Sequence, residues 1–214
     1  MSSVLRVEWR ITPKVAPQPW LSCNRCGGVR PFRCSDKIRV NANGRRLDAW
    51  LIYNCAHCDN SWNRPLFTRR NIREIDPLSL HALQANDADL ARRLAFDVDD
   101  LRRSTERVDE FAAVEVQKQV LSQAGGPFAT VDIIMAVPTP TCLRADRLLA
   151  TELGLSRARI DALQEAGRLL IVPQGARALR RPVRDRTRVT ITLCAADGID
   201  VGKAAGVLDA GPAP

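Results

Sequence analysis

The sequence lacks the long apolar runs that would take a protein into or across a membrane. Its first residues lead directly into polar and aromatic positions instead of the apolar stretch of a signal peptide, and the apolar runs elsewhere are too short to span a bilayer. We therefore expect a cytoplasmic protein with no membrane partner. Disulfides are rare in that reducing compartment, so closely spaced cysteines are expected to bind metal before they form disulfides.

The residue patterns of common enzymes are also missing. The sequence has no glycine-rich cofactor loop and no recognisable pairing of a nucleophile with a base. Five aspartates in the middle of the chain are the obvious candidate acids, but most occupy positions typical of helix caps and first turns. They are Asp87, Asp89, Asp97, Asp99 and Asp100. We therefore predict a protein that is not an enzyme, with an RNA-modifying enzyme as the alternative.

Acidic residues are scarce at both ends of the chain, and the formal net charge is +8. Residues 1–75 carry 14 Lys and Arg against 5 acids, residues 76–142 carry 6 against 11, and residues 143–193 carry 11 against 5. Two basic segments therefore flank an acidic one, which is expected if both ends contact phosphate groups. A GC-rich genome would also raise the arginine content, but it would not separate the two signs along the chain.

Two Cys-x-x-Cys pairs mark the N-terminal segment. Cys23 and Cys26 form the first pair, and Cys55 and Cys58 form the second. Four thiolates are thus available for the tetrahedral coordination that zinc prefers. We predict one structural Zn²⁺ held by these four residues, in a zinc ribbon that covers residues 1–75. Buried, reduced cysteines without a metal ion are the alternative.

The other cysteines, and the histidine near these pairs, are weaker candidates. Cys34 follows the first pair in an expected strand and is predicted to pack as a small hydrophobe. His57 lies inside the second pair and is predicted to face solvent, because four thiolates complete the coordination shell. A catalytic zinc ion would need an open coordination position, and no pattern of a general base lies nearby. Cys142 and Cys194 are distant, and no function is assigned to them.

The segment between the two cysteine pairs is basic and contains aromatic residues. The 28 residues between Cys26 and Cys55 are enough for a β-hairpin with Asn43-Gly44 at its turn. Basic side chains interleaved with aromatic rings suit nucleic acid, because the charge binds phosphate and the rings stack on bases. Trp50 and Trp62 are nevertheless predicted to form the small core of the ribbon. The residues predicted to bind RNA here are Lys37, Arg39, Arg45 and Arg46.

Residues 76–142 form an acidic middle region. Capping residues recur along its first half, which predicts two or three short helices up to about residue 105. They are Asp76, followed by Pro77, then Asn86 or Asp87, and Asp97. Alternating residues at 114–116 and 131–133 predict two strands around Gly125-Gly126. Pro138 and Pro140 predict a linker to the next domain.

Residues 143–194 carry the most informative pattern. A helix is predicted over residues 144–153 with a stop at Gly154, and Ser156 caps a second helix; strands are predicted at 169–172 and 188–193. The distinctive residues are Arg144-Ala145-Asp146, Leu153-Gly154-Leu155-Ser156-Arg157, and Leu163 to Leu169. Together they resemble the alpha-L RNA-binding motif, a domain of a ribosomal small-subunit protein that pseudouridine synthases and heat-shock ribosome-binding proteins share. The segments Val172-Pro173-Gln174-Gly175 and Asp185-Arg186 depart from the family's pattern.

This resemblance implies two helices and a small sheet that bind structured RNA by its shape and backbone. Arg157 and Arg159 would meet RNA phosphates at the start of the second helix, where the helix dipole and free N–H groups favour an anion. The full set of residues predicted to bind RNA in this domain is Arg144, Arg147, Arg157, Arg159, Arg180, Arg181 and Arg184. A solvated charged face is the alternative.

The whole chain, and residues 39–44 and 47–53 in particular, resembles an uncharacterised bacterial family catalogued as domain of unknown function 1062. That resemblance implies an architecture without an activity. We expect an α+β fold with a zinc ribbon, a helical and β middle region, an alpha-L motif, and a tail over residues 195–214 without fixed structure. The expected function is a zinc-containing RNA-binding protein that acts on ribosomal or transfer RNA, with the ribosome as a candidate partner. A zinc-ribbon regulator that binds DNA or docks on proteins is a further alternative.

Overall fold

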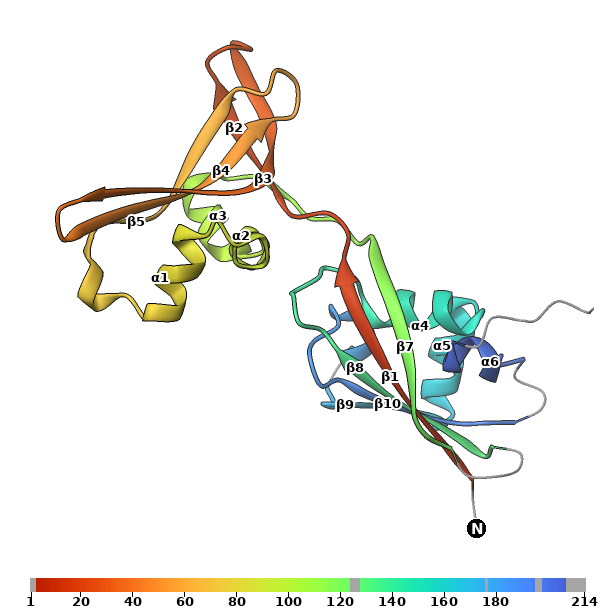
Figure 1. Ribbon diagram of the computed structural model, residues 1–214. Coiled ribbons are helices and arrows are strands. Elements are labelled where there is room, and N and C mark those ends of the chain that lie inside the picture. The colour runs from red at the N-terminus through yellow and green to blue at the C-terminus, as the bar shows by residue number, and fades with distance from the viewer. Residues whose placement is uncertain (1–2, 124–127, 176, 195–197, 207–214) are drawn as a thin grey trace, which may run out of the picture. The chain divides into compact units, whose positions relative to one another are not determined.

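The computed structural model describes residues 3–123, 128–175, 177–194 and 198–206 of the chain. It is a mixed α+β structure that divides into two compact units (Figure 1). Unit 1 contains Met1–Lys14 together with Phe111–Pro214, and unit 2 contains Val15–Glu110. Within the described residues, no helix is both long enough and apolar enough to cross a membrane.

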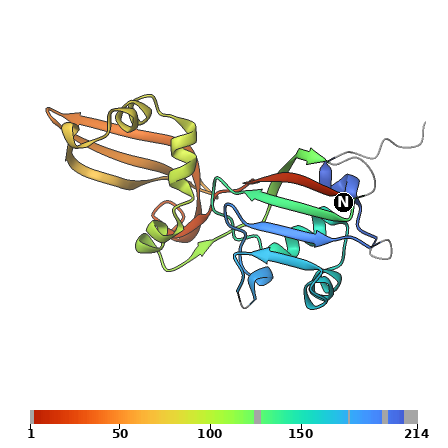
Figure 2. The same cartoon turned by 90° about the horizontal axis from the view of Figure 1, so that it is seen from below.

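Unit 1 is built on a five-stranded sheet with the order β7-β1-β8-β10-β9. The strand β1 pairs antiparallel with β7 and parallel with β8, so Figure 2 shows the red β1 between two green strands. The first strand of the chain is therefore internal to a sheet whose other strands all follow residue 113. The strands are β1 (Val4–Pro13), β7 (Val114–Gln123), β8 (Thr130–Ala136), β9 (Leu169–Val172) and β10 (Arg188–Thr192).

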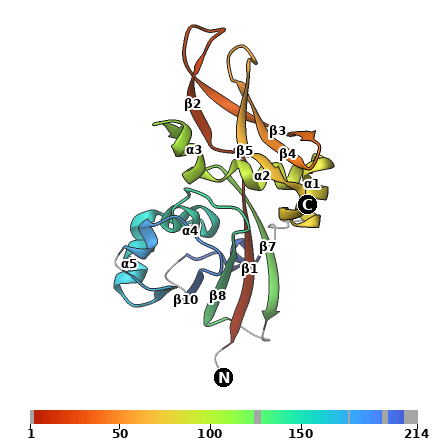
Figure 3. The ribbon, with the colours of Figure 1, turned by 90° about the vertical axis from the view of Figure 1, so that its left-hand side faces the viewer.

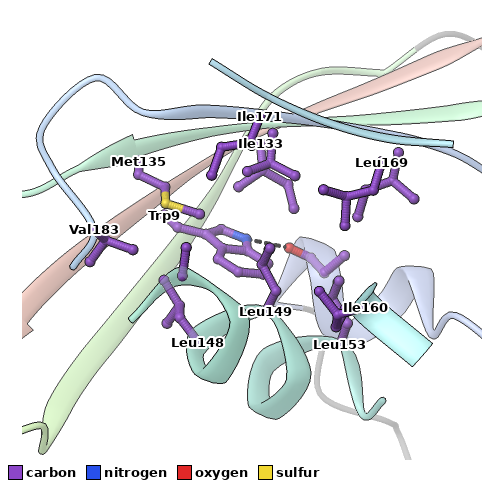
Figure 4. Packing of buried hydrophobic residues seen from close by; sticks show 14 of the residues in the cluster. Trp9, Ile133, Met135, Leu148, Leu149, Leu153, Ile160, Leu169, Ile171 and Val183 are labelled. Atoms are coloured by element: carbon purple, nitrogen blue, oxygen red, sulfur yellow. Dashed lines mark hydrogen bonds between the residues drawn. The ribbon is translucent and has the colours of Figure 1, made fainter. Parts of the chain in front are cut away.

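The helices α4 (Ala145–Leu153) and α5 (Arg157–Glu165) pack against this sheet (Figures 1 and 3). Alternate residues of β1 are fully buried, as a strand with one covered face requires. Figure 4 shows the indole of Trp9 packed beside Leu148 and Leu149 of α4, with Met135 of β8 near it. A short 3₁₀ helix, η2 (Ala178–Arg180), also contacts α4.

A short helix near the C-terminus completes the core of unit 1. In α6 (Val201–Ala205), Ala204 is fully buried and its carbonyl oxygen accepts a hydrogen bond of 2.9 Å from Trp9 Nε1 (Figure 4). Lys118 Nζ lies 4.9 Å from the centre of the Trp9 ring and donates to the carbonyl of Lys203 at 2.7 Å. This differs from the expectation of no fixed structure over residues 195–214. A segment of five residues is too short to form a stable helix alone, so its tertiary contacts stabilise α6.

Unit 2 is a second five-stranded sheet, of order β5-β4-β3-β2-β6, with three α-helices on one face (Figure 1). All of its strand pairs are antiparallel. Its strands are β2 (Gln18–Cys23), β3 (Gly28–Asn43), β4 (Arg46–Cys55), β5 (Ser61–Asn71) and β6 (Val108–Asp109). Its helices are η1 (Ile72–Glu74), α1 (Pro77–Gln84), α2 (Ala88–Ala95) and α3 (Val98–Ser104).

The core of unit 2 lies between these helices and one face of the sheet. Alternate residues of β4, from Leu47 to Cys55, are buried and pack with Ala91, Ala95 and Leu101 of the helices. Arg64 of β5 is also buried, and its guanidinium is paired with Asp100 and donates to the carbonyl of Leu94 at 3.0 Å. A charged side chain is tolerated in this core because its donors have partners.

Several local predictions are confirmed. Asp76, Asp87 and Asp97 each cap a helix, because each side chain accepts a hydrogen bond from a first-turn backbone N–H. Gly154 ends α4 with a φ of 69°, and Ser156 caps α5 by accepting from the backbone N–H of Arg159. The strands predicted near residues 114 and 131 are β7 and β8, while Gly125-Gly126 lies outside the described residues.

The grouping of these elements differs from the four segments predicted from the sequence. The three helices of the middle region belong to unit 2, whereas its two strands flank β1 in unit 1. The expected linker at Pro138 stays within unit 1, where Val137 and Leu143 are buried. The strands β9 and β10 continue a five-stranded sheet and do not form a separate small one. Long-range strand pairing decides this grouping, and local sequence patterns do not encode it.

We predict that Trp9→Phe destabilises unit 1. The substitution leaves the buried carbonyl of Ala204 without its donor, which costs about 1–3 kcal/mol of unfolding free energy. Urea denaturation followed by far-ultraviolet circular dichroism measures this loss. Leu170→Ala is the matched control, because Leu170 lies on β9 with 51% of its surface exposed and should change stability little. Equal stability of Trp9→Phe and the wild type would contradict the role of this hydrogen bond.

Candidate metal centre and basic surfaces

Four cysteine side chains meet at one end of the sheet in unit 2. The sulfur atoms of Cys23, Cys26, Cys55 and Cys58 all lie within 4.8 Å of one another, so the group could hold a metal ion. The Sγ atoms of Cys23 and Cys58 are 3.5 Å apart, and those of Cys26 and Cys55 are 3.9 Å apart. Four thiolates bound tetrahedrally at about 2.3 Å from one ion have sulfur–sulfur separations of about 3.8 Å. The observed spacing therefore fits a four-coordinate ion.

Both cysteine pairs lie on hairpin turns of the same form. Cys23 ends β2 and its carbonyl accepts from the backbone N–H of Gly27, while Cys55 ends β4 and its carbonyl accepts from the N–H of Asp59. Gly27 and Asp59 both have left-handed φ values, of 67° and 58°. This backbone curls each turn so that its two thiols point to the same side, and Figures 1 and 3 show the two turns next to each other.

The electrostatics of the cluster favours a cation at its centre. Burial alone would raise the pKa of Cys23, but hydrogen bonds from the backbone N–H of Cys26 and from neighbouring thiols lower that pKa to about 6. The pKa of Cys26 is raised to about 12 by its hydrogen bond with Cys58, by burial and by the charge on Cys23. Without a cation, one thiolate thus suppresses ionisation of its neighbour. A divalent ion would stabilise all four thiolates together.

The other cysteines lie outside this group. Cys34 is half-buried on β3 and packs against the core of unit 2, as predicted. Burial raises the pKa of the Cys34 thiol to about 11, and its sulfur is not among the clustered ones. His57 is exposed, as predicted for a spacer residue. Cys142 is half-buried and Cys194 is exposed, and neither is among the clustered cysteines.

The basic residues predicted on the N-terminal hairpin are all exposed. Lys37 lies where a bulge interrupts the pairing of β3 with β4, and Arg45 lies in the turn between those strands. Arg39 and Arg46 lie on the face of the sheet that is opposite the helices. Trp62 packs against the core as predicted, but the prediction of a core position for Trp50 is wrong. Trp50 lies on the opposite face, because the buried residues of β4 alternate with it.

The seven arginines predicted in the C-terminal domain lie around α4, α5 and η2. Arg157 is the first residue of α5 and is exposed, and Arg159 is half-buried on the same turn. Arg181 and Arg184 are exposed and line one small pocket of about 140 Å³. Arg147 is exposed on α4. The structure therefore brings Arg181 and Arg184 together at one pocket and links the neighbouring Arg180 to α5 through Asp161.

Two of the seven arginines are engaged by acidic groups. Arg144 is half-buried, and its Nε and Nη2 atoms donate to the carboxylate of Asp146 at 3.0 and 2.6 Å. Asp146 is itself buried, so this pair stabilises the start of α4. Arg180 contacts Asp161 of α5 at 3.3 Å. The charge on Arg144 is thus largely compensated within the protein.

The aspartates considered as candidate acids have structural partners or capping positions. Asp87 and Asp97 cap helices, Asp99 contacts Arg102 at 3.8 Å, and Asp100 pairs with the buried Arg64. Asp89 lies in the first turn of α2. Asp97 and Asp100 also line one pocket, beside apolar residues of α2 and β5 and the buried Arg64 with which Asp100 pairs.

Residues 40–174 match the model of a family described as a protein of unknown function (DUF1062). The chain belongs to the DUF1062 family. The matched region of this DUF1062 chain runs from β3 to the residues after β9, and it includes the second cysteine pair and Arg157 but not the first cysteine pair. No curated protein and no solved structure matches the chain.

We predict that the purified protein carries one metal ion per chain and that Cys55→Ser abolishes its binding. Cys55 is fully buried, so loss of its thiolate breaks the coordination shell and unfolds the adjoining turns. Elemental analysis by mass spectrometry measures the metal content. Cys34→Ser is the control, because this half-buried thiol is outside the cluster and its loss should leave the metal content unchanged. A metal-free wild-type protein, or Cys34→Ser protein that loses the ion, would contradict this assignment.

Proposed function

We propose that this protein is a zinc-containing, non-enzymatic RNA-binding protein that contacts ribosomal or transfer RNA through basic surfaces on both units. The observation that carries the proposal is the set of exposed arginines in the C-terminal part without acidic partners. Among the described residues, Arg147, Arg157, Arg181 and Arg184 form no ion pair. Exposed, uncompensated guanidinium groups favour a polyanionic ligand.

Three arginines of the acidic middle region provide a contrast. Arg102 contacts Asp99 and Glu110, Arg103 contacts Asp100, and Arg107 contacts Asp109. These side chains are also exposed, but their charges are balanced by acids of unit 2. The exposed C-terminal arginines without an ion pair therefore support a binding role for that part of the protein.

Three of the free arginines, Arg157, Arg181 and Arg184, are connected through α5 and η2. Arg157 and Asp161 are four residues apart and therefore lie on the same face of α5. Asp161 contacts Arg180, and Arg181 follows it at the pocket that Arg184 also lines. The side-chain oxygen of Ser156 occupies one first-turn N–H of α5, that of Arg159. The remaining N–H groups and the arginines offer donors to a phosphate backbone.

Zinc is the ion we assign to the four-cysteine cluster. Four thiolates are soft ligands in a closed shell, which suits Zn²⁺ in a structural site. The ion would join the β2–β3 turn to the β4–β5 turn and would leave no coordination position for a substrate. Its contribution is therefore to hold the basic hairpin in a fixed conformation. We assign α4, α5, β9 and β10 to an alpha-L motif, because the sequence of residues 144–169 resembles that motif and its helices carry exposed arginines.

The RNA-binding proposal predicts binding that weakens steeply with salt and weakens further in Arg157→Glu. Reversal of one phosphate-contacting charge should reduce the affinity several-fold and lower the slope of log K against log salt by about 1. Filter binding of labelled total RNA and co-sedimentation with ribosomes, each over a salt series, measure both quantities. A second arm uses duplex DNA at equal nucleotide concentration, and RNA is expected to bind more tightly.

Arg102→Glu is the matched control for this prediction. It makes the same change in net charge at an exposed residue, 55% of whose side chain is accessible, but this residue lies in the acidic region and pairs with Glu110. We expect its RNA affinity to stay close to that of the wild type. Binding that is absent, or that does not respond to salt, would disprove the proposal. Tighter binding to duplex DNA would favour a DNA-binding regulator.

A further inference from the structure

The sheet of unit 2 has a second face that the helices do not cover, which we call the outer face. The register of β3, β4 and β5 places alternate residues of these strands on it, opposite the buried set that begins with Leu47. The helices α1 to α3 pack on the other face (Figure 1). The outer face consists of Arg33, Arg39, Asn41, Asn43, Arg46, Asp48, Trp50, Ile52, Asn54, Ser61, Asn63, Pro65 and Asn71.

Trp50 lies at the centre of the outer face. It is on β4, between β3 and β5, and it is directly opposite Arg39 on one side and Pro65 on the other. The guanidinium carbon of Arg39 lies 6.0 Å from the centre of the Trp50 ring. Trp50 is partly exposed, and it does not belong to the core of unit 2. A tryptophan in this position with an arginine beside it offers a flat surface on which a nucleobase can stack.

The polar residues around Trp50 are unusual for a solvated sheet face because asparagine predominates among them. Asparagine is unfavourable in strands, so its repeated use on one face needs another explanation. The amides of Asn41, Asn43 and Asn63 are exposed and form no hydrogen bond among the described residues. Asn54 and Asn71 each accept a hydrogen bond, from Ser61 and from the N–H of Arg73. An amide both donates and accepts, which matches base edges and ribose 2′-hydroxyl groups.

The charge on the outer face favours the same kind of ligand. Arg33, Arg39 and Arg46 are exposed on it, against one acid, Asp48. The Asp48 carboxylate accepts from the backbone N–H of Arg69 at 2.6 Å, so it has a structural partner. Arg33 makes one exposed contact of 3.8 Å with Asp59, which is weak at this exposure. The face is therefore basic around a central ring.

We propose that the outer face binds single-stranded RNA, with one base stacked on Trp50, the asparagine amides at the base edges and riboses, and the arginines at the phosphates. A flat sheet cannot enter the narrow major groove of an RNA duplex, whereas unpaired bases can lie on it. This inference rests on the proposed RNA-binding function and deepens it. Unit 1 binds structured RNA through its arginine surface, and unit 2 binds an unpaired segment of the RNA.

The test uses the full-length protein and two labelled probes, a twelve-nucleotide oligouridine and a stable RNA hairpin with a four-nucleotide loop, in fluorescence anisotropy titrations. Trp50→Ala should weaken oligouridine binding about tenfold, as loss of one base-stacking contact does. Trp50→Phe keeps an aromatic ring and should restore most of the affinity. Asn63→Ala changes an exposed side chain and should weaken oligouridine binding about threefold.

Trp20→Ala is the matched control for Trp50→Ala. Trp20 is also half-buried in unit 2, but it lies on β2, which is separated from β4 by β3. Its ring is covered by Arg107 at 3.8 Å and its Nε1 donates to Asp109 at 2.8 Å, so it is engaged within the protein. Metal content and circular dichroism confirm that each variant is folded, and Asn63→Ala provides the readout if a tryptophan variant is not. The control should bind oligouridine as the wild type does.

The outcomes separate this inference from the proposed function. Wild-type protein that binds the hairpin but not oligouridine, or folded variants of Trp50 and Asn63 that bind oligouridine unchanged, would overturn the outer-face assignment and leave RNA binding intact. A twelve-nucleotide oligodeoxyuridine is titrated as a comparison strand, and binding equal to or tighter than that of oligouridine would overturn the assignment of the outer face to RNA. Loss of hairpin binding in Arg157→Glu, with oligouridine binding retained, would support the division between the two units. Absence of binding to both probes would overturn both proposals.

Discussion

The position of β1 between β7 and β8 is the constraint on which the architecture depends. Residues 4–13 bury alternate side chains and supply backbone hydrogen bonds to both neighbours, so neither β7 nor β8 has another partner on that side. The sheet also provides the surface that α4 and α5 cover, and the Trp9 ring is the point at which α6 is held. The arginine surface of unit 1 is displayed by helices that only this sheet supports.

Signals that act within a few residues could be predicted from the sequence. Asp76-Pro77, Asp97 and the Gly154 to Ser156 segment specify helix ends through hydrogen bonds and φ values that depend on neighbouring residues alone. The spacing of the cysteines likewise predicts a cluster, because each pair needs only one tight turn to direct two thiols to the same side. These local features account for most of the candidate metal centre.

Features that depend on distant residues could not be predicted. The sequence predicts β7 and β8 as two strands by their alternating residues. It does not predict that both pair with β1, which lies more than a hundred residues earlier. The helix α6 is capped by Asp200 and Gly206 but is only five residues long, and the burial of Ala204 depends on distant elements that include Trp9. The orientation of Trp50 is an exception, because it follows from the sequence alone: the alternation from Leu47 to Tyr53 places Trp50 on the face opposite the apolar residues. A core position for Trp50 is expected only if the size of the aromatic ring is given more weight than this alternation.

The two ends of unit 2 are joined to each other by strand pairing. Pro19 pairs with Val108 and Gln18 pairs with Asp109, while Pro13 pairs with Val114 at the end of β1. Unit 2 is therefore an insertion between two adjacent strands of a hairpin. A short turn in its place would leave the β1–β7 pair covalently continuous, and the excised segment could be closed on itself. Unit 2 can thus be inserted, removed or replaced as a domain without altering the hydrogen bonding of the sheet in unit 1.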